Sequence, residues 1–240
     1  MKKKKSDVEQ RSTKHKRPLE RREVLKAGAL GALAVCASTG TALAGGSKTK
    51  RYVMVIDLRK CIGCHACSVA CKSENKVPLS VWRSWVKQIE RGKYPNTQRH
   101  FLPRLCNHCE HPSCVEACPT TASYQRDDGI VLIHKERCIG CQLCVSACPY
   151  DSRFLHPEEK IASKCTFCDH RVDNGVVPSC VNTCQGKARI FGDMNDPTSE
   201  VARLISREAV QVLKPELGTE PRVFYIASDT GLAGRIRKEV

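Results

Sequence analysis

The stretch Cys138-Ile-Gly-Cys141-Gln-Leu-Cys144-Val-Ser-Ala-Cys148-Pro149 decides how this chain folds. Its cysteines follow the spacing C-x2-C-x2-C-x3-C-P, which holds cubane iron–sulfur clusters. The first three thiolates reach three irons of one cube, whereas the fourth is a ligand of a neighbouring cube. One such run therefore implies a second.

Three further groups of four cysteines occur in the chain. They are Cys61, Cys64, Cys67 and Cys71; Cys106, Cys109, Cys114 and Cys118, followed by Pro119; and Cys165, Cys168, Cys180 and Cys184. The four groups account for sixteen of the 17 cysteines, and the remaining one is Cys36, near the N-terminus. C-x2-C pairs spread over a chain of 240 residues indicate metal sites rather than disulfides.

Zinc is the alternative metal, and it would make the chain a zinc-stabilised interaction module. C-x2-C pairs separated by a spacer satisfy all-cysteine zinc sites. Zinc does not explain why a third cysteine follows after two more residues, nor why the fourth is followed by proline at Cys148 and Cys118. Iron–sulfur clusters therefore explain the pattern better than zinc does.

The formal net charge of +15 would by itself suggest a nucleic acid or an anionic membrane as partner. Residues 1–44 hold eleven Lys and Arg against four Asp and Glu, so +7 of this charge precedes residue 45 and +8 follows it. Four oxidised four-iron clusters with their thiolates would carry about 8− in total. The basic excess therefore balances cluster charge, and no nucleic-acid partner is expected because the sequence has no basic stripe interleaved with aromatic residues.

Residues 1–44 have the features of an export signal. A lysine-rich start is followed by Arg21-Arg22, an apolar run over 27–37, and Ala42-Leu43-Ala44 as a cleavage site. The paired arginines are similar to the twin-arginine signal, which exports folded proteins, although Glu20 and Val24 depart from its usual residues. We therefore expect residues 45–240 to reach the periplasmic face of the cytoplasmic membrane with their clusters already inserted. The alternative is a disordered basic tail before a chance apolar helix.

The rest of the pattern predicts an α+β fold. Strands are expected over 51–57, 187–191 and 222–226, a helix over 66–73, and a hairpin with strands at 121–125 and 130–134. The hairpin prediction depends on Asp127-Asp128-Gly129, a strong turn signal. No stretch after the leader approaches 18 consecutive apolar residues, so no membrane span is expected in the mature chain.

Two regions without cysteines complete the predicted fold. Residues 78–104, which contain Trp82 and Trp85, are expected to form an inserted strand and loop. Asp196 is expected to cap a C-terminal helix that begins at Pro197 and buries Val201.

Over residues 61–184 the cysteine pattern resembles the iron–sulfur subunits of the molybdopterin oxidoreductases. That family includes DMSO, polysulfide, thiosulfate, tetrathionate and nitrate reductases. The resemblance implies two ferredoxin-like modules in tandem, each holding two [4Fe-4S] clusters. The first and fourth cysteine groups would form one module, and the second and third groups the other.

The resemblance also implies ligand sets, because the fourth cysteine of each group crosses to the cluster of its paired group in this family. Cluster one would be held by Cys61, Cys64, Cys67 and Cys184, and cluster two by Cys71, Cys165, Cys168 and Cys180. Cluster three would be held by Cys106, Cys109, Cys114 and Cys148, and cluster four by Cys118, Cys138, Cys141 and Cys144. Some relatives have Trp at the position of Cys141 and a three-iron cluster there, so the cysteine predicts four [4Fe-4S] clusters.

Other polar residues lie in or beside the cysteine loops. Four histidines do so: His65, His108, His111 and His170. Since every predicted cube already has four thiolates, these histidines are expected near the clusters or on the surface rather than as ligands. Four basic residues precede cysteine groups: Lys60, Arg104, Arg137 and Lys164. Two interpretations remain open for them, namely that they raise cluster potentials or that they are solvated surface charges.

The resemblance implies an electron-transfer subunit with no catalytic residue of its own. Electrons would pass from a quinol-oxidising membrane subunit through clusters four, three, two and one to a molybdopterin-containing catalytic subunit. Local strings such as Lys164-Cys165-Thr166-Phe167-Cys168 are most similar to the tetrathionate branch of the family. The alternatives are the same role in a thiosulfate, polysulfide or DMSO-type reductase, and a free periplasmic polyferredoxin.

Overall fold

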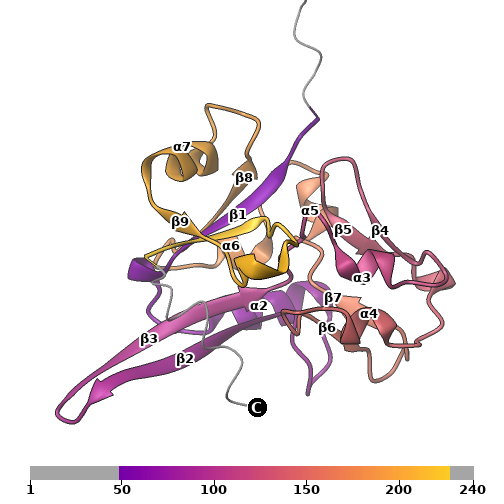
Figure 1. Cartoon of the computed structure of the whole chain (residues 1–240), viewed down its shortest axis with the longest axis horizontal. Helices are drawn as coiled ribbons and strands as arrows, with labels where there is room; N and C mark the ends of the chain where they lie inside the picture. Colours follow the sequence, from indigo (N-terminus) through magenta and orange to yellow (C-terminus); the bar gives the residue numbers. More distant parts are fainter. Residues whose placement is uncertain (1–48, 228–240) are drawn as a thin grey trace, which may run out of the picture. The chain divides into compact units, whose positions relative to one another are not determined.

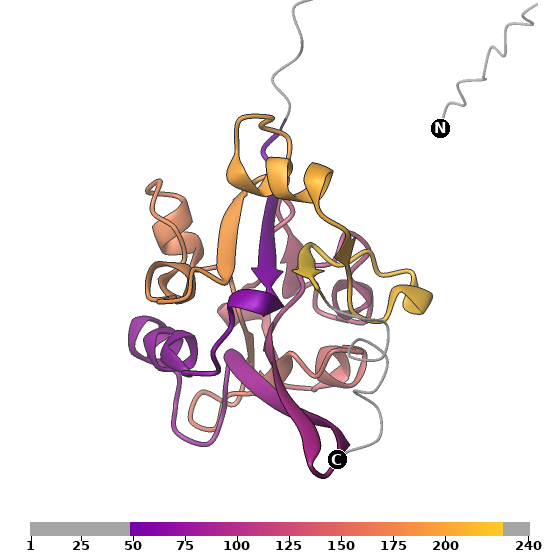
Figure 2. The same ribbon diagram turned by 90° about the vertical axis from the view of Figure 1, so that its left-hand side faces the viewer.

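The computed structural model describes residues 49–227, so the predicted export signal and Cys36 lie outside the described residues. Strand β1, Tyr52–Asp57, lies inside a four-stranded sheet of order β8-β1-β10-β9 (Figures 1 and 2). Strand β10, Val223–Ile226, runs parallel to β1, whereas β8, Arg189–Asp193, runs antiparallel to it. The strands predicted over 51–57 and 222–226 are therefore confirmed, and the sheet places them side by side.

Both faces of β1 are covered, which explains its continuous apolar sequence. Met54 and Ile56 belong to the main core beside the cysteine loops, whereas Val53 and Val55 form a second core with Val201. All five side chains are 0% exposed. Successive side chains of a strand point to opposite faces, so β1 separates the cysteine loops from helix α7, Glu200–Arg207.

The start of α7 corrects a prediction. Ser199, not Asp196, is the N-cap, and its side chain accepts a hydrogen bond from the Ala202 amide. The Asp196 side chain instead accepts hydrogen bonds from the Thr198 amide and hydroxyl, at 2.8 and 2.7 Å. The aspartate thus forms a turn before the helix, a use that competes with helix capping. Val201 is buried as expected.

The insertion between the first two cysteine groups is a hairpin of two long strands rather than one strand and a loop. Strand β2, Ser84–Lys93, pairs along its whole length with β3, Asn96–Leu105. Val86, Leu102 and Leu105 at the base are buried, whereas Tyr94 at the tip is 93% exposed. In Figure 1 the hairpin projects away from the other elements.

Two smaller hairpins accompany the second and third cysteine groups. Strands β4, Ser123–Gln125, and β5, Val131–Ile133, form the predicted hairpin, which is therefore confirmed. Strands β6, Arg153–Leu155, and β7, Ala162–Lys164, form a second hairpin that the sequence did not reveal. Three-residue strands are too short to show a periodic pattern. The sheet is completed by the two-residue strand β9, Val210–Gln211.

The remaining elements are short helices, most of them beside the cysteine loops. They are α2 (Ala66–Asn75), α3 (Ser113–Glu116), α4 (Leu143–Ser146), α5 (Asp169–Val172) and α6 (Ser179–Asn182), with 3-10 turns η1 (Leu58–Lys60), η2 (Lys135–Arg137) and η3 (Pro215–Leu217). Helix α2 contacts α6, and α3 contacts α4. The first group thus packs against the fourth, and the second against the third. Within residues 49–227 no helix has both the length and the apolar character that a membrane crossing requires.

Candidate iron–sulfur centres

The first cavity lined by cysteines joins the two ends of the cysteine pattern. Cys61, Cys64 and Cys67, around the start of α2, line it together with Cys184, which follows α6. Gly186 lets these two loops approach, because a Cβ atom there would lie 2.4 Å from the Lys60 carbonyl oxygen. These four cysteines are the ligand set predicted for cluster one.

A second cavity is lined by cysteines of the same two helices and of the segment after β7. It is lined by Cys71 at the middle of α2, Cys165 and Cys168 after β7, and Cys180 in α6. All four are buried. Burial raises the pKa of the Cys71 thiol to about 12, and the neighbouring Cys180 and Cys168 sulfurs add to this effect. The four cysteines are the set predicted for cluster two.

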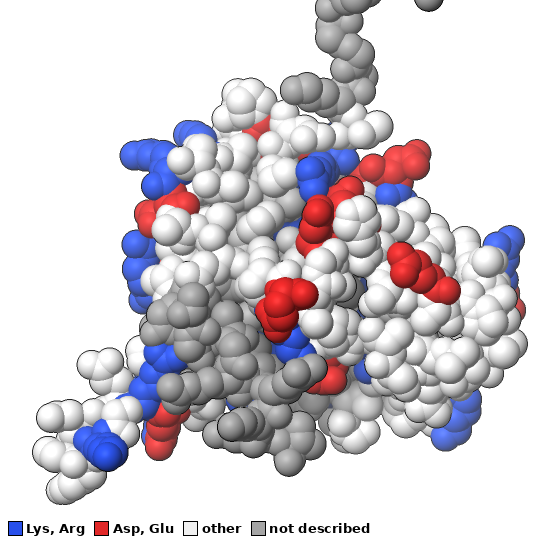
Figure 3. Space-filling model, viewed as in Figure 1, with Lys and Arg blue, Asp and Glu red and all other residues white. Residues whose placement is uncertain are grey.

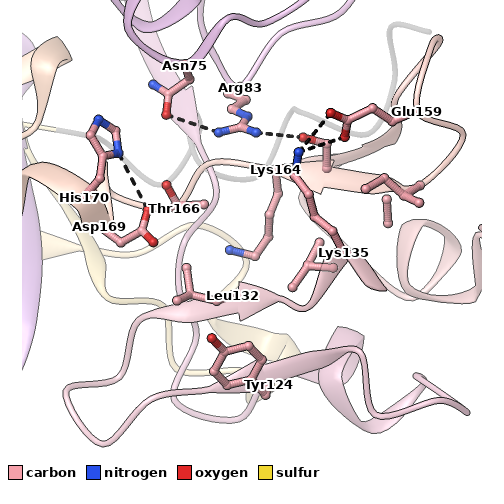
Figure 4. Close-up of a pocket in the computed structure, with 14 residues that line it drawn as sticks. Asn75, Arg83, Tyr124, Leu132, Lys135, Glu159, Lys164, Thr166, Asp169 and His170 are labelled. Carbon is pink, nitrogen blue, oxygen red and sulfur yellow. Dashed lines mark hydrogen bonds and ion pairs between the residues drawn. The ribbon is translucent and has the colours of Figure 1, made fainter. Parts of the chain in front are cut away.

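The side-chain amide of Asn75 is directed at two cysteine sulfurs of this second set. The Asn75 Nδ2 atom lies 3.6 Å from Cys168 Sγ and 3.8 Å from Cys71 Sγ. Its Oδ1 atom accepts a hydrogen bond from Arg83 at 3.2 Å, which fixes the amide in this orientation (Figure 4). Hydrogen bonds to cluster sulfur are among the factors that set the reduction potential.

The third set consists of Cys106, Cys109, Cys114 and Cys148. Burial, together with the sulfurs of the other three cysteines, raises the pKa of Cys109 to about 12. Burial likewise raises the pKa of Cys114 to about 11, with Cys106 and Cys148 contributing. These four thiols therefore lie within electrostatic reach of one another. They are the set predicted for cluster three, including the crossing cysteine Cys148.

Two cysteines of the fourth predicted set accept hydrogen bonds from backbone amides. The Ser123 amide donates to Cys118 Sγ and the Ala162 amide to Cys138 Sγ, both at 3.4 Å. Cys144 lies in α4, which packs against α3, so it lies beside the helix that Cys118 follows. The structure thus brings Cys118 and Cys144 of this set close together through the packing of α3 against α4.

The donor chemistry fits four-iron clusters. Among the described residues, no group of three or more His, Cys, Asp or Glu is arranged to hold a single metal ion. Four sulfurs around one zinc would each lie about 2.3 Å from it, whereas a cube spreads its four ligands over a wider core. Bare thiolates are unfavourable in the buried sites, so they require a positively charged core. The ligand sets themselves remain predictions.

The four histidines singled out in the sequence lie in different places and do not gather around one cysteine-lined cavity. His108 is buried, stacks on Phe167 at 3.8 Å, and accepts a hydrogen bond from the Val131 amide. Burial holds the pKa of His108 well below its usual value, so the ring is neutral. His111 lies 3.8 Å from Glu220 and His170 lies 2.9 Å from Glu74. Of the four, His65 lines the first cavity and adopts a left-handed conformation before α2.

The four basic residues singled out in the sequence fall into two classes. Lys60 and Arg137 are exposed, whereas Arg104 and Lys164 are buried. Sequence reasoning missed two further buried cations, Arg153 and Arg189. Both stand five residues after the fourth cysteine of their group, a shared position that marks them in the sequence but does not reveal their burial.

Charged side chains of both signs are interspersed over the face shown in Figure 3. Basic side chains also lie along the projecting β2–β3 hairpin. Each tryptophan of the hairpin region lies against a cation: Lys72 is 4.1 Å from the Trp82 ring centroid and Arg104 is 5.3 Å from that of Trp85. These contacts give the two tryptophans a packing role.

Comparison with known proteins identifies the class of site. Residues 97–194 match a family model described as a 4Fe-4S dicluster domain, and residues 52–73 match one described as a 4Fe-4S binding domain. The chain is 50% identical over 198 residues to the B subunit of tetrathionate reductase from Salmonella typhimurium, and the match covers 79% of each protein.

Two further relatives extend the comparison. The B subunit of tetrathionate reductase from Archaeoglobus fulgidus is 44% identical over 177 residues, or 74% of this chain and 82% of that one. The B chain of polysulfide reductase from Wolinella succinogenes is 40% identical over 185 residues, or 76% of this chain and 97% of that one. The predicted cofactors, four [4Fe-4S] clusters, and the predicted lack of catalysis by this chain are confirmed by these matches. The chain therefore belongs to the iron–sulfur electron-transfer subunits of the molybdopterin reductases.

Proposed function

We propose that this chain passes single electrons from a quinol-oxidising membrane subunit to a molybdopterin-containing catalytic subunit. The main support for this proposal is the difference in exposure between cysteines of different sets. Cys64 and Cys141, the second cysteines of the first and third groups, are exposed, whereas all four cysteines of the second set are buried. With the predicted ligand sets, clusters one and four reach the surface and cluster two lies inside. Electrons would therefore enter and leave at the two ends.

Apolar side chains beside the exposed cysteines support docking at both ends. Ile62, between Cys61 and Cys64, is 63% exposed. Ile139, at the same place between Cys138 and Cys141, is 70% exposed, and the nearby Leu143 is 52% exposed. Exposed apolar side chains grouped at a redox centre are typical of a protein interface. In the proposed complex Ile62 faces the catalytic subunit and Ile139 faces the membrane subunit.

The chain's own residues hold the clusters and exclude water from them. Each cluster, when bound, supplies a site that accepts and releases one electron. The described residues contribute buried thiol donors, backbone amides directed at sulfur, and Asn75 beside two cysteines.

Tetrathionate is the acceptor that we propose for the complete reductase. Support comes from the two tetrathionate reductase relatives, at 50% and 44% identity. The same role in a polysulfide, thiosulfate or DMSO-type reductase is the alternative, and the polysulfide reductase relative from Wolinella is 40% identical. A free periplasmic polyferredoxin is the remaining candidate.

We also propose that the chain acts at the periplasmic face of the membrane, after export through a twin-arginine signal in residues 1–44. Sixteen free thiols delivered unfolded to an oxidising compartment would pair into disulfides. Export of the folded, cluster-loaded chain 45–240 avoids this outcome. Microscopy of a fusion, with Arg21 and Arg22 both replaced by Lys, should show the protein retained in the cytoplasm.

Purification of the tagged chain from gently solubilised membranes tests the proposed function. We expect a large molybdopterin-containing subunit to accompany it, and the complex to oxidise reduced viologen with tetrathionate. Oxidation only with thiosulfate or polysulfide would keep the electron-transfer role and change the acceptor. A lone, cluster-loaded chain that remains soluble would favour the polyferredoxin. Reduction of tetrathionate by the loaded chain without any partner would contradict the proposal.

A further inference from the structure

Five cationic side chains are buried among residues 49–227: Arg104, Arg153, Lys164, Arg189 and Arg222. Arg222 forms an ion pair with Glu110. Arg104 donates to the Tyr150 carbonyl oxygen at 2.6 Å and lies against the Trp85 ring. Within the described part of the chain, only Arg222 of these five pairs with an Asp or Glu carboxylate, and Arg153, Lys164 and Arg189 have neither such a partner nor an aromatic ring beside the charge. Since an unpaired buried charge is strongly unfavourable, these three cations need another source of negative charge.

Arg189 lies between the first and second cysteine sets. Its side chain lines the cavity of Cys61, Cys64, Cys67 and Cys184. Its Nη1 atom is 3.8 Å from Cys180 Sγ, which belongs to the second set, and Nη2 donates to Ser84 Oγ at 3.0 Å. The thiolates with the largest electrostatic effect on Arg189 are Cys180 and Cys67, one from each set. Its positive charge is therefore shared by the two neighbouring sites.

Arg153 occupies the matching position in the other half of the molecule. It follows Cys148 by five residues, as Arg189 follows Cys184. The thiolates with the largest electrostatic effect on Arg153 are Cys114 and Cys106 of the third set and Cys144 of the fourth. Its Nη1 atom donates to Ser123 Oγ at 2.7 Å, and the Ser123 amide donates to Cys118 of the fourth set. Arg153 thus lies between the third and fourth sets.

Lys164 lies between the two halves. Its side chain extends toward β5, as Figure 4 shows, and Nζ donates to the carbonyl oxygens of Val131 and Cys165. The thiolates around it are Cys106 and Cys114 of the third set and Cys165 of the second. Lys164 is 1% exposed, and although burial lowers the pKa of its ammonium group, the three neighbouring thiolates favour the charged form. A buried cation therefore also lies between the third and second cysteine sets, where the remaining electron-transfer step would occur.

We propose that Arg153, Lys164 and Arg189 form a row of buried cations, one at each step between successive clusters, that raises the reduction potentials of the clusters on both sides. Each reduction adds one electron and thus one negative charge to a cluster, and a nearby fixed cation stabilises the reduced form. The effect is strong because the sites are buried. This inference rests on the proposed ligand sets and makes the three cations positioning residues for electron transfer, not ligands.

Redox titration of the assembled complex, followed by electron paramagnetic resonance, tests the proposal. In Arg189→Gln we expect the reduction equilibria of clusters one and two to shift at least tenfold toward the oxidised form, which is about 59 mV for a one-electron couple. Clusters three and four should keep their midpoint potentials. Arg153→Gln should give the reciprocal result, with clusters three and four shifted. Arg189→Lys, which keeps the charge, should restore most of the potential.

Two further variants complete the test. Arg137→Gln is the matched control, because this arginine directly precedes Cys138 but is exposed, so all four potentials should stay unchanged. Ser84→Asp places a carboxylate against Arg189 and neutralises the charge in place, so it should lower the same two potentials even if Arg189→Gln does not fold. Unchanged potentials in cluster-loaded Arg189→Gln and Arg153→Gln, or an equal fall of all four, would overturn the inference. A shift of one cluster from each half in Arg189→Gln, rather than of clusters one and two, would instead refute the ligand sets.

Discussion

Individual backbone amides and side chains surround the cysteine sulfurs with hydrogen-bond donors. The Phe167 amide lies 3.4 Å from Cys165 Sγ, and the Ala188 amide lies 3.2 Å from Cys184 Sγ. Donors of this kind stabilise negative charge on sulfur and fix the position of the ligand. Each cysteine loop therefore carries both a ligand and part of the electrostatic environment of its cluster.

Replacing Cys148 with Ser tests the crossing of the fourth cysteine. Because Cys148 lies with Cys106, Cys109 and Cys114, the spectroscopic change should occur in cluster three, which the second group holds. Cys144→Ser is the matched variant: it lies in the same run but belongs to the fourth set, so the change should occur in cluster four. Paramagnetic resonance spectra of the two reduced variants provide the measurement. Identical changes in both would contradict the crossed pairing.

Asp57 predicts a pH-dependent contribution to stability. Its side chain is 3% exposed, and although burial would raise its pKa, hydrogen bonds from Arg59 hold that pKa below its usual value. A depressed folded-state pKa gives stability that is present above the unfolded pKa of about 3.9 and is lost as pH falls through the folded pKa. Asp57→Asn should therefore lower the midpoint of thermal cluster bleaching at pH 7 by about 3–6 °C.

The difference between Asp57→Asn and the unsubstituted chain should stay constant from pH 7 to pH 5 and narrow below pH 4. Asp196→Asn is the control, since Asp196 is an exposed turn residue and an asparagine side chain can form the same turn. It should change the midpoint by less than about 1 °C. A gap between Asp57→Asn and the unsubstituted chain that widens as the pH falls would be inconsistent with the account.

At the scale of elements, a glycine in the left-handed conformation lies near the start of both the first and the third cysteine loop. Gly63 and Gly140 occupy the same place in the two C-I-G-C strings and have φ values of +71° and +70°. This left-handed conformation favours glycine. A Cβ atom at Gly63 would meet the Phe101 ring, and one at Gly140 would lie 2.4 Å from the Lys160 carbonyl oxygen. Both loops are therefore packed tightly against neighbouring elements.

Gly140→Ala should lower the iron content of cluster four and destabilise the chain. The positive φ costs about 1 kcal/mol, and the contact with the Lys160 backbone adds about 1–3 kcal/mol. Gly175→Ala separates the two effects, because Gly175 has φ +73° but nothing within 4 Å of the added Cβ atom. That variant should retain all its iron and lose only about 1 kcal/mol. Iron analysis and thermal midpoints distinguish the variants, and equal effects at both positions would show that the Lys160 contact is unimportant.

Elements with a local sequence signal could be predicted, whereas elements that depend on tertiary contacts could not. The β1 strand and the β4–β5 hairpin were predictable, because a buried apolar run and an Asp-Gly turn are local signals. Strand β3 was not, because Pro103 within it argues against a strand, although it pairs with Val86 of β2. Both Asp196 and Ser199 are good helix caps, and only the turn formed by Asp196 decides between them. The shared position of Arg153 and Arg189, five residues after a fourth cysteine, does not by itself predict burial, because Lys76 has the same position after Cys71 and is exposed.

At the scale of the whole molecule, the two exposed cysteines and their apolar neighbours define two ends with different expected partners. Ile62→Glu should release the catalytic subunit while the membrane subunit stays bound. Ile139→Glu, the same change at the equivalent place of the other end, should release the membrane subunit instead. Affinity purification followed by subunit identification measures both. Cluster content should remain unchanged in both variants, since the two side chains are exposed. Loss of the same subunit from both variants would contradict the two-ended arrangement.

Electron flow through this chain during turnover is the central claim, and rapid freeze-quenching measures it most directly. The assembled complex is reduced chemically, mixed with tetrathionate, frozen at successive times, and examined by paramagnetic resonance. We predict that the clusters reoxidise at least as fast as the acceptor is consumed, and that Cys184→Ser, which removes a ligand predicted for cluster one, slows reoxidation of the other three. Clusters that stay reduced while tetrathionate is consumed would contradict the account.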